Sequence, residues 1–377
     1  MSDVQLKFNE NGQFKILVAA DLHMLEPNSA KGFDTVRLLE AAVEELRPDL
    51  AVFLGDNVTM WDAITEESVR DAIDAIVTPI AQKGIPLAVV FGNHECETPL
   101  GNAGQLEHFQ TYSKCLAVKG EPETGVGNYN LVIKSHDGSH DRFNLWFIDS
   151  GSSIINPDGS ESYDYVRENQ LRWYEQTAEK LRSTNHGYNL PAIVFQHMTV
   201  PEEYELLREV PALTPFAVKG HGSRSDKYYV IAQPRFTKGE LAEGPCPPDF
   251  NSGEFECWKR QGDVIGAVFG HDHVNDFDGT VDGIRLVQAR GSGFQGYGDG
   301  DSRAVTLITL DESDLGTFDS EGFFFRELVG KSVSMPGAKA LTRKEKTAIG
   351  IGGGSAAVVA AAGFGAIISK IIKRKKK

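Results

Sequence analysis

Short apolar segments alternate with amphipathic ones along the first 95 residues of this chain. The segments FKILVAA, DLAVFLG and IPLAVVFG are rich in Val, Ile, Leu and Phe, which is typical of buried strands. Between them, residues 34–46 and 66–83 place apolar side chains at helical spacing and predict two amphipathic helices. The alternation of strand and helix predicts an α/β fold.

The same pattern continues in the rest of the body. The segments PAIVFQ and VIGAVFG predict two more buried strands, and a helix is predicted around residues 165–183. Shorter strands are predicted at YNLVIKSH, RFNLWFIDS, DGIRLVQA, RAVTLITL and FFFREL. Residues 201–250 contain seven of the 16 prolines and show little periodicity, so we expect an irregular excursion there.

Five of the buried strands lead into a polar motif. The motifs are Asp21-Leu22-His23, Gly55-Asp56-Asn57, Gly92-Asn93-His94-Glu95, the single His197 and Gly270-His271-Asp272-His273. In open α/β sheets, ligands collect beyond the carboxyl ends of the strands. We therefore expect these side chains to meet at one site, with the 201–250 excursion lying over it.

The residue types in the motifs indicate a pair of metal ions and phosphoester hydrolysis. Imidazole and carboxylate ligands suit Zn, Mn, Fe or Co, and the motifs contain no thiolate. Two ions about 3.5–4 Å apart require a shared anionic bridge, and Asp56 is suited to it because Gly55 permits close approach. Asn93 can contribute a neutral carbonyl oxygen. His94 is placed to meet the substrate, and Glu95 and Asp272 are candidates to orient the ligand histidines.

In this order, the motifs resemble the DxH, GDxx, GNHE, lone His and GHxH pattern of the calcineurin-like metallophosphoesterase superfamily, over roughly residues 12–330. The segment PPDFNSGEFECWKRQGDVIGAVFGHDHVNDF is similar to the branch of plant purple-acid-phosphatase-like proteins and fungal phosphoprotein phosphatases. The resemblance implies a four-layer α/β/β/α sandwich in which two mixed β-sheets are flanked by helices.

The resemblance also implies a role for each motif residue. The first metal ion would be held by Asp21, His23, Asp56 and His273, and the second by Asp56, Asn93, His197 and His271. His94 would be the catalytic histidine. The two ions would be divalent or trivalent Mn, Zn, Fe or Co. True purple acid phosphatases carry a tyrosine three residues after the bridging Asp, whereas this chain has Thr59, so no tyrosinate–iron colour is expected.

The expected function is hydrolysis of phosphomonoesters by a metal-activated hydroxide, with His94 assisting the leaving group. The substrate would be a phosphorylated small molecule or a phosphoprotein. A phosphodiesterase or nuclease using the same metals is an alternative, and a non-catalytic membrane-associated binding scaffold is another. Residues 1–342 carry 29 basic and 52 acidic side chains, a net charge of −23, which disfavours nucleic acid as a partner.

The chain divides into a body and a tail. We expect residues 1–335 to form the phosphoesterase domain, 336–346 a linker, and 347–377 a Gly/Ala-rich apolar tail with a basic end. Residues 347–369 contain no charged side chain and could cross a bilayer of about 30 Å, although six glycines make them weakly apolar. Membrane association of the tail, either across the bilayer or on its anionic inner leaflet, is favoured over a flexible solvated tail, and its topology is open.

The remaining sequence features indicate a cytoplasmic location, with membrane association through residues 347–377. The N-terminal segment MSDVQLKFNENGQFK has no apolar signal core. Four cysteines, Cys96, Cys115, Cys246 and Cys257, indicate no disulfide scaffold in a chain of this length.

Deletion of residues 343–377 tests the expected role of the tail. Hydrolysis of a small soluble ester should remain, because every motif lies before residue 274. The protein should move from the membrane to the soluble fraction, because nine positive charges and the apolar segment are removed together. High salt should partly release an interfacial tail but not a spanning helix. A full-length protein that is wholly soluble and ignores anionic vesicles would refute membrane association.

Overall fold

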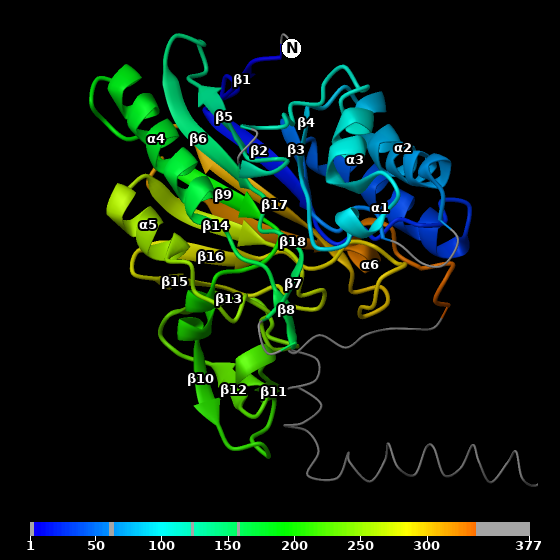
Figure 1. Cartoon of the computed structure of the whole chain (residues 1–377). Helices are drawn as coiled ribbons and strands as arrows, with labels where there is room; N and C mark the ends of the chain where they lie inside the picture. The colour runs from blue at the N-terminus through cyan, green and yellow to red at the C-terminus, as the bar shows by residue number, and fades with distance from the viewer. Residues whose placement is uncertain (1–3, 60–63, 122–123, 157–158, 337–377) are drawn as a thin grey trace, which may run out of the picture. The chain divides into compact units, whose positions relative to one another are not determined.

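The computed structural model describes residues 4–59, 64–121, 124–156 and 159–336 of the chain. Two mixed β-sheets lie against one another, with helices on their outer faces (Figure 1). The predicted four-layer α/β/β/α architecture is therefore confirmed. Both sheets belong to one compact unit.

The smaller sheet contains most of the N-terminal strands. Its order is β18-β17-β2-β3-β4, with β2 (Gln13–Ala19), β3 (Leu50–Leu54) and β4 (Leu87–Val90) parallel to one another. Strands β17 (Ala304–Asp311) and β18 (Asp319–Phe324) complete it in antiparallel pairing. Helices α1 (Ala30–Leu46), α2 (Glu66–Gln82) and α3 (Gly101–Phe109) lie among these strands along the chain, and the first two confirm the predicted helices.

The larger sheet has the order β1-β5-β6-β9-β14-β16-β15-β13. Its parallel centre contains β6 (Asp141–Ile148), β9 (Ala192–Gln196), β14 (Val264–Phe269) and β16 (Ile284–Gln288). Its other strands are β1 (Leu6–Lys7), β5 (Tyr129–Lys134), β13 (Phe236–Lys238) and β15 (Asp278–Val281). The predicted helix at 165–183 is α4 (Glu168–Thr184), and α5 (Glu254–Gln261) was not predicted.

Alternating side chains of the larger sheet supply two separate apolar cores. In β6, Leu145 and Phe147 join the core that the smaller sheet also lines, whereas Trp146 and Ile148 join a second core. That second core includes Tyr174 from α4 and further side chains from α5. A strand side-chain period of two accounts for this division, and it explains why the central strands are apolar on both faces.

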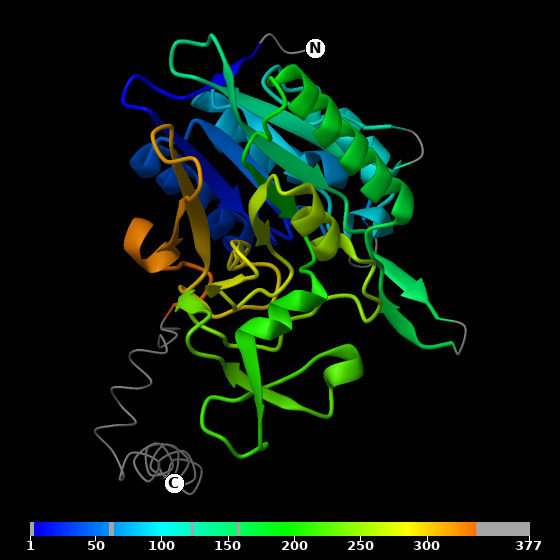
Figure 2. The same cartoon turned by 90° about the vertical axis from the view of Figure 1, so that its left-hand side faces the viewer.

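Two parts of the chain differ from the predictions. The 201–250 excursion is less irregular than expected, because β10 (Leu207–Val210), β11 (Val218–Lys219) and β12 (Tyr228–Ile231) form a small antiparallel sheet. This sheet extends away from the two main sheets (Figure 2). The predicted closing strand FFFREL is only half correct, since β18 ends at Phe324 and the helical turn α6 (Phe325–Leu328) follows.

Residues 337–377, which include nearly all of the predicted linker and the whole tail, lie outside the described residues. Within the described ranges, no helix combines the length and the apolar character needed to cross a bilayer. All four cysteines are free thiols.

A buried carboxylate on α1 holds the end of the body. Asp34 is fully buried and accepts hydrogen bonds from the hydroxyl of Ser332 at 2.7 Å and from the backbone N–H and hydroxyl of Ser334 at 2.9 and 2.7 Å. Arg37 also donates to it, at 3.0 Å. Burial alone would raise the pKa of Asp34, but the hydrogen bonds from the two serines outweigh it and lower that pKa.

Asp34→Ala should therefore lower the free energy of unfolding at neutral pH by about 1–3 kcal/mol, because several buried donors lose their acceptor. Since the pKa is lowered in the folded state, the difference from wild type should shrink as the pH falls below about 4. Urea denaturation at pH 7 and at lower pH measures both effects. Asp71→Ala, at an exposed position on α2, is the matched control. Equal destabilisation by both changes would contradict the anchoring role of Asp34.

Candidate metal centre

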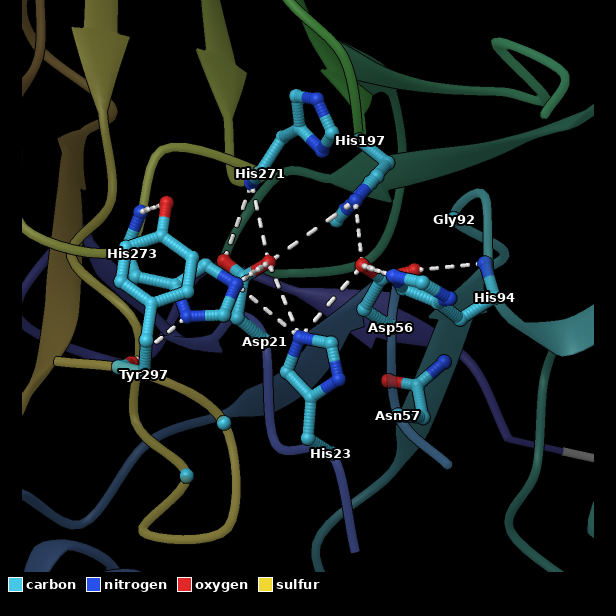
Figure 3. A network of polar contacts seen from close by, with 12 residues as sticks. Asp21, His23, Asp56, Asn57, Gly92, His94, His197, His271, His273 and Tyr297 are labelled. Atoms are coloured by element: carbon cyan, nitrogen blue, oxygen red, sulfur yellow. Dashed lines mark hydrogen bonds and ion pairs between the residues drawn. The ribbon is translucent and has the colours of Figure 1, made fainter. Parts of the chain in front are cut away.

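The structure brings the predicted site residues together at one edge of the two sheets. Each follows a parallel strand: Asp21 and His23 follow β2, Asp56 follows β3, Asn93 and His94 follow β4, His197 follows β9, and His271 and His273 follow β14. Figure 3 shows the carboxylates and imidazoles of this set converging from both sheets. The sequence-based expectation of one shared site is thus matched by the geometry.

The side chains form two overlapping groups of donor atoms. In the first group, Asp21, His23, Asp56 and His273 each offer an atom within 4.8 Å of the others. The Nε2 atoms of His23 and His273 lie 3.1 Å apart, and Nε2 of His273 lies 3.4 Å from Oδ1 of Asp21. Asp56 belongs to this group and also to the next one, which is the arrangement that a bridging carboxylate requires.

The second group contains Asp56, His197 and His271, again with donor atoms within 4.8 Å. Nε2 of His197 lies 3.2 Å from Oδ2 of Asp56. Asn93 is buried next to His94, whose backbone N–H donates to Oδ1 of Asp56 at 3.0 Å. The backbone of the Asn93–His94 segment is therefore tied to the carboxylate of Asp56.

Unsatisfied acceptor atoms indicate that this donor set fits metal ions. Nδ1 of His197 donates to the carbonyl oxygen of Leu54 at 2.9 Å, which leaves Nε2 as the nitrogen that faces the other donors. Nε2 of His197, Nε2 of His271 and Oδ1 of Asn93 are buried without hydrogen-bond partners among the described residues. Buried acceptors without a donor are unfavourable, and a cation satisfies all three at once.

Burial also sets the charge of the imidazoles. It lowers the pKa of His23 to about 3 and that of His273 to about 4, and it lowers the pKa of His271 as well. Burial raises the pKa of Asp21 above its usual range. Burial would also raise the pKa of Asp56, but the charge of His197 outweighs it and holds that pKa low. Neutral His23, His271 and His273 beside an ionised carboxylate are the forms that bind metal ions. Burial would also lower the pKa of His197, but Asp56 outweighs it and raises that pKa to about 10, so an ion that binds Nε2 of His197 displaces a proton.

Sharp backbone turns aim the donors inward. Asp21, His23, Asp56 and His271 have φ of 51°, 44°, 49° and 71°, in the left-handed region that residues with a Cβ rarely adopt. The motif glycines leave room for these side chains. A Cβ on Gly55 would lie 2.5 Å from the ring of His197, and one on Gly92 would lie 2.3 Å from Oδ1 of Asp56.

Glu95 and Asp272 were expected to orient the ligand histidines. That prediction was wrong, because both carboxylates form hydrogen bonds to other groups. Glu95 accepts hydrogen bonds from the backbone N–H groups of Asn57 and Gly92, at 2.5 and 2.8 Å, and thereby ties two site loops together. Asp272 accepts a hydrogen bond from Nε2 of Gln288 at 2.9 Å. Both carboxylates are buried behind the donors.

Tyr297 supports His273, and sequence reasoning missed this role. Its ring stacks on the imidazole with centroids 3.9 Å apart, and its carbonyl oxygen bonds Nδ1 of His273 at 2.8 Å (Figure 3). The tyrosine hydroxyl is held by Glu243 at 2.9 Å. Gly296 and Gly298 flank Tyr297, and a Cβ on Gly296 would lie 2.9 Å from both His23 and His273. The tyrosine between these two glycines was the sequence feature that could have indicated a residue packed against the site.

Comparisons with known proteins agree with the geometry. The sequence family described as Calcineurin-like phosphoesterase matches residues 14–275. "Probable inactive purple acid phosphatase 14" of Arabidopsis thaliana is 29% identical over 334 residues, which are 81% of this chain and 77% of that protein. "Phosphatase DCR2" of Saccharomyces cerevisiae is 26% identical over 311 residues, 76% of this chain and 49% of that protein. A dimetal phosphatase of Danio rerio aligns in structure with a TM-score of 0.49 and 13% identity, over 82% of this chain and 99% of that one.

Asp56→Asn tests whether one carboxylate serves both groups of donors. The reconstituted wild-type protein should contain close to two metal ions per chain, and the variant should lose affinity at both positions together, because the bridge loses its charge. Elemental analysis after dialysis measures the content, and circular dichroism confirms the fold. Asp226→Asn, at an exposed position in the excursion, is the control. A wild type with one ion or none, or a variant that loses only one ion, would contradict the shared bridge.

Proposed function

Because this chain belongs to the calcineurin-like phosphoesterase family, we propose that it hydrolyses phosphoesters at a binuclear metal centre and that its substrates are phosphomonoesters. The observation that carries the proposal is the sharing of Asp56 by two groups of buried donors. His94 lies beside them, with its Nε2 4.0 Å from Oδ2 of Asp56.

The proposed division of the side chains between the two ions follows the family resemblance. Asp21, His23 and His273 would complete one position with Asp56, and Asn93, His197 and His271 would complete the other. Bound Mn, Zn, Fe or Co ions would neutralise phosphate oxygens and lower the pKa of a coordinated water.

His94 is the residue proposed to act on the leaving group. Its Nδ1 is held by Oε2 of Glu97 at 2.8 Å, which leaves Nε2 directed to the site. Its side chain is about a third exposed, at 35%, unlike the buried ligands, so a substrate can reach it. In the reaction, water oxygen forms a new bond to phosphorus as the bond to the alcohol oxygen breaks. His94 Nε2 gives its proton to that departing oxygen, and the water supplies a proton in return.

One second candidate function has support from a relative. The Arabidopsis protein carries the word "inactive" in its name, which favours a non-catalytic binding scaffold for this chain as well. A scaffold has no need of a histidine beside a complete donor set. This chain retains all seven donors and His94, which supports the catalytic proposal.

His94→Ala distinguishes the two candidates. Turnover of p-nitrophenyl phosphate by the metal-loaded protein should fall by about 10²–10⁴, because the general acid is lost, while the metal content stays near that of wild type. His186→Ala, which removes an exposed histidine, should change neither value. The wild type should also hydrolyse the monoester faster than bis(p-nitrophenyl) phosphate.

Three results would count against this assignment. Loss of metal from His94→Ala would make the histidine a ligand. Faster hydrolysis of the diester would make the chain a phosphodiesterase. A metal-loaded wild type that hydrolyses neither ester would support the scaffold.

A further inference from the structure

A cavity of roughly 380 Å³ opens beside His94 and adjoins the proposed metal donors at Asn93. Asn93 and His94 form the part of its lining that belongs to the metal centre. Asn93 is 8% exposed, and it is the residue that the proposed donor set shares with the cavity lining. A phosphoester bound at the centre therefore has this space available for its alcohol.

The remaining walls come from three segments outside the motifs. They are the hairpin of β7 (Ser153–Ile155) and β8 (Glu161–Tyr163), the turn η4 (Gly222–Arg224) with His221 before it, and residues 247–249. The turn and residues 247–249 belong to the 201–250 excursion that was expected over the site, whereas the hairpin was not predicted there. Their side chains determine what the cavity can accept.

An aromatic row connects the metal donors to the cavity. The ring of Tyr163 meets His271 edge-on, with centroids 4.5 Å apart and an interplanar angle of 87°. On its other side, Tyr163 stacks with His221 at 5.3 Å and 27°. The row starts at a proposed ligand and ends in the cavity wall, so an alcohol leaving from the centre lies against aromatic rings.

The charged side chains that line the cavity are acidic. Glu97, Glu161 and Asp249 contribute carboxylates, and the lining within the described residues contains no Lys or Arg. Oδ1 of Asp249 accepts a hydrogen bond from the backbone N–H of Ser223 at 2.7 Å. Burial lowers the pKa of His221, although Asp249 opposes it, so the aromatic wall is neutral.

Nearby basic side chains are engaged elsewhere. The guanidinium of Arg224 lies over the ring of Tyr204, 4.4 Å from its centroid. Arg167 pairs with Asp164, and Lys227 pairs with Glu209 at 3.1 Å. Glu97 is paired with His94 at 2.8 Å, so the lining carboxylates that form no salt bridge with a described residue are Glu161 and Asp249, and these two supply most of the negative field of the cavity.

We propose that this cavity selects phosphomonoesters whose alcohol carries a positive charge, an ammonium group held against Tyr163 and His221 and among Glu97, Glu161 and Asp249. The inference rests on the proposed function and names its substrate class. Aromatic faces and carboxylates attract an ammonium ion, and the attraction strengthens where water is displaced. The same lining repels an alcohol that bears a carboxylate or a second phosphate.

Two esters of the same shape provide the test. Choline phosphate carries a quaternary ammonium, and 3,3-dimethylbutyl phosphate replaces the nitrogen by carbon. With the manganese-reconstituted full-length protein, kcat/KM should be roughly tenfold higher for choline phosphate, as expected for a cation against aromatic rings and carboxylates. Equal values, or a preference for the neutral ester, would overturn the proposal.

Variants assign the preference to the cavity. Glu161→Gln and Asp249→Asn should each reduce the ratio of the two kcat/KM values several-fold, and Tyr163→Leu should reduce it as well. Glu67→Gln removes an exposed carboxylate on α2 and should leave the ratio unchanged. A ratio unaffected by all three cavity variants would also overturn the proposal.

Calorimetric binding separates this inference from the proposed function. Affinities of the two esters are measured with the manganese-loaded His94→Ala variant, in which turnover is slowed. Tighter binding of choline phosphate supports the cavity assignment even if neither ester is hydrolysed, and in that case only the proposed catalysis fails. Equal binding refutes the assignment whatever the activity.

Discussion

The burial of Asp21 and Asp56 side by side among imidazoles is the constraint on which the structure of the site depends. Each of these two residues is only 1% exposed. Their carboxylates repel each other, and burial disfavours the negative charge on each. Only positive charge placed between them relieves both effects, which is why the donor geometry fits metal ions. The protein must hold these groups together before any ion binds, and the surrounding structure shows how it does so.

Rigid strands and tight turns provide that hold. Parallel strands from two sheets end at the same edge, and four donor residues turn inward through left-handed backbone, which costs about 1–3 kcal/mol per residue. Glu95 joins the loops that carry Asn57 and Gly92, and Tyr297 fixes the ring of His273. The two apolar cores behind the strands supply the stability that offsets this strain.

The structure assigns chemistry and selectivity to different parts of the chain. The metal donors follow strands of the two sheets, where packing leaves little freedom. The cavity walls come from a hairpin, a turn and a loop, including Tyr163, His221 and Asp249. Loops on a rigid scaffold can change without disturbing the core.

The sequence by itself determined the α/β class, the long helices α1, α2 and α4, and the set of residues at the centre, because strand periodicity and strand-end motifs are local signals. It did not show that Glu95 ties loops instead of orienting a histidine, or that Tyr297 supports His273, because these contacts join residues far apart in the chain. The small sheet of the excursion and the row from His271 through Tyr163 to His221 were likewise decided only by tertiary structure. A side chain's partners depend on which segments pack together, and a local sequence pattern does not determine this packing.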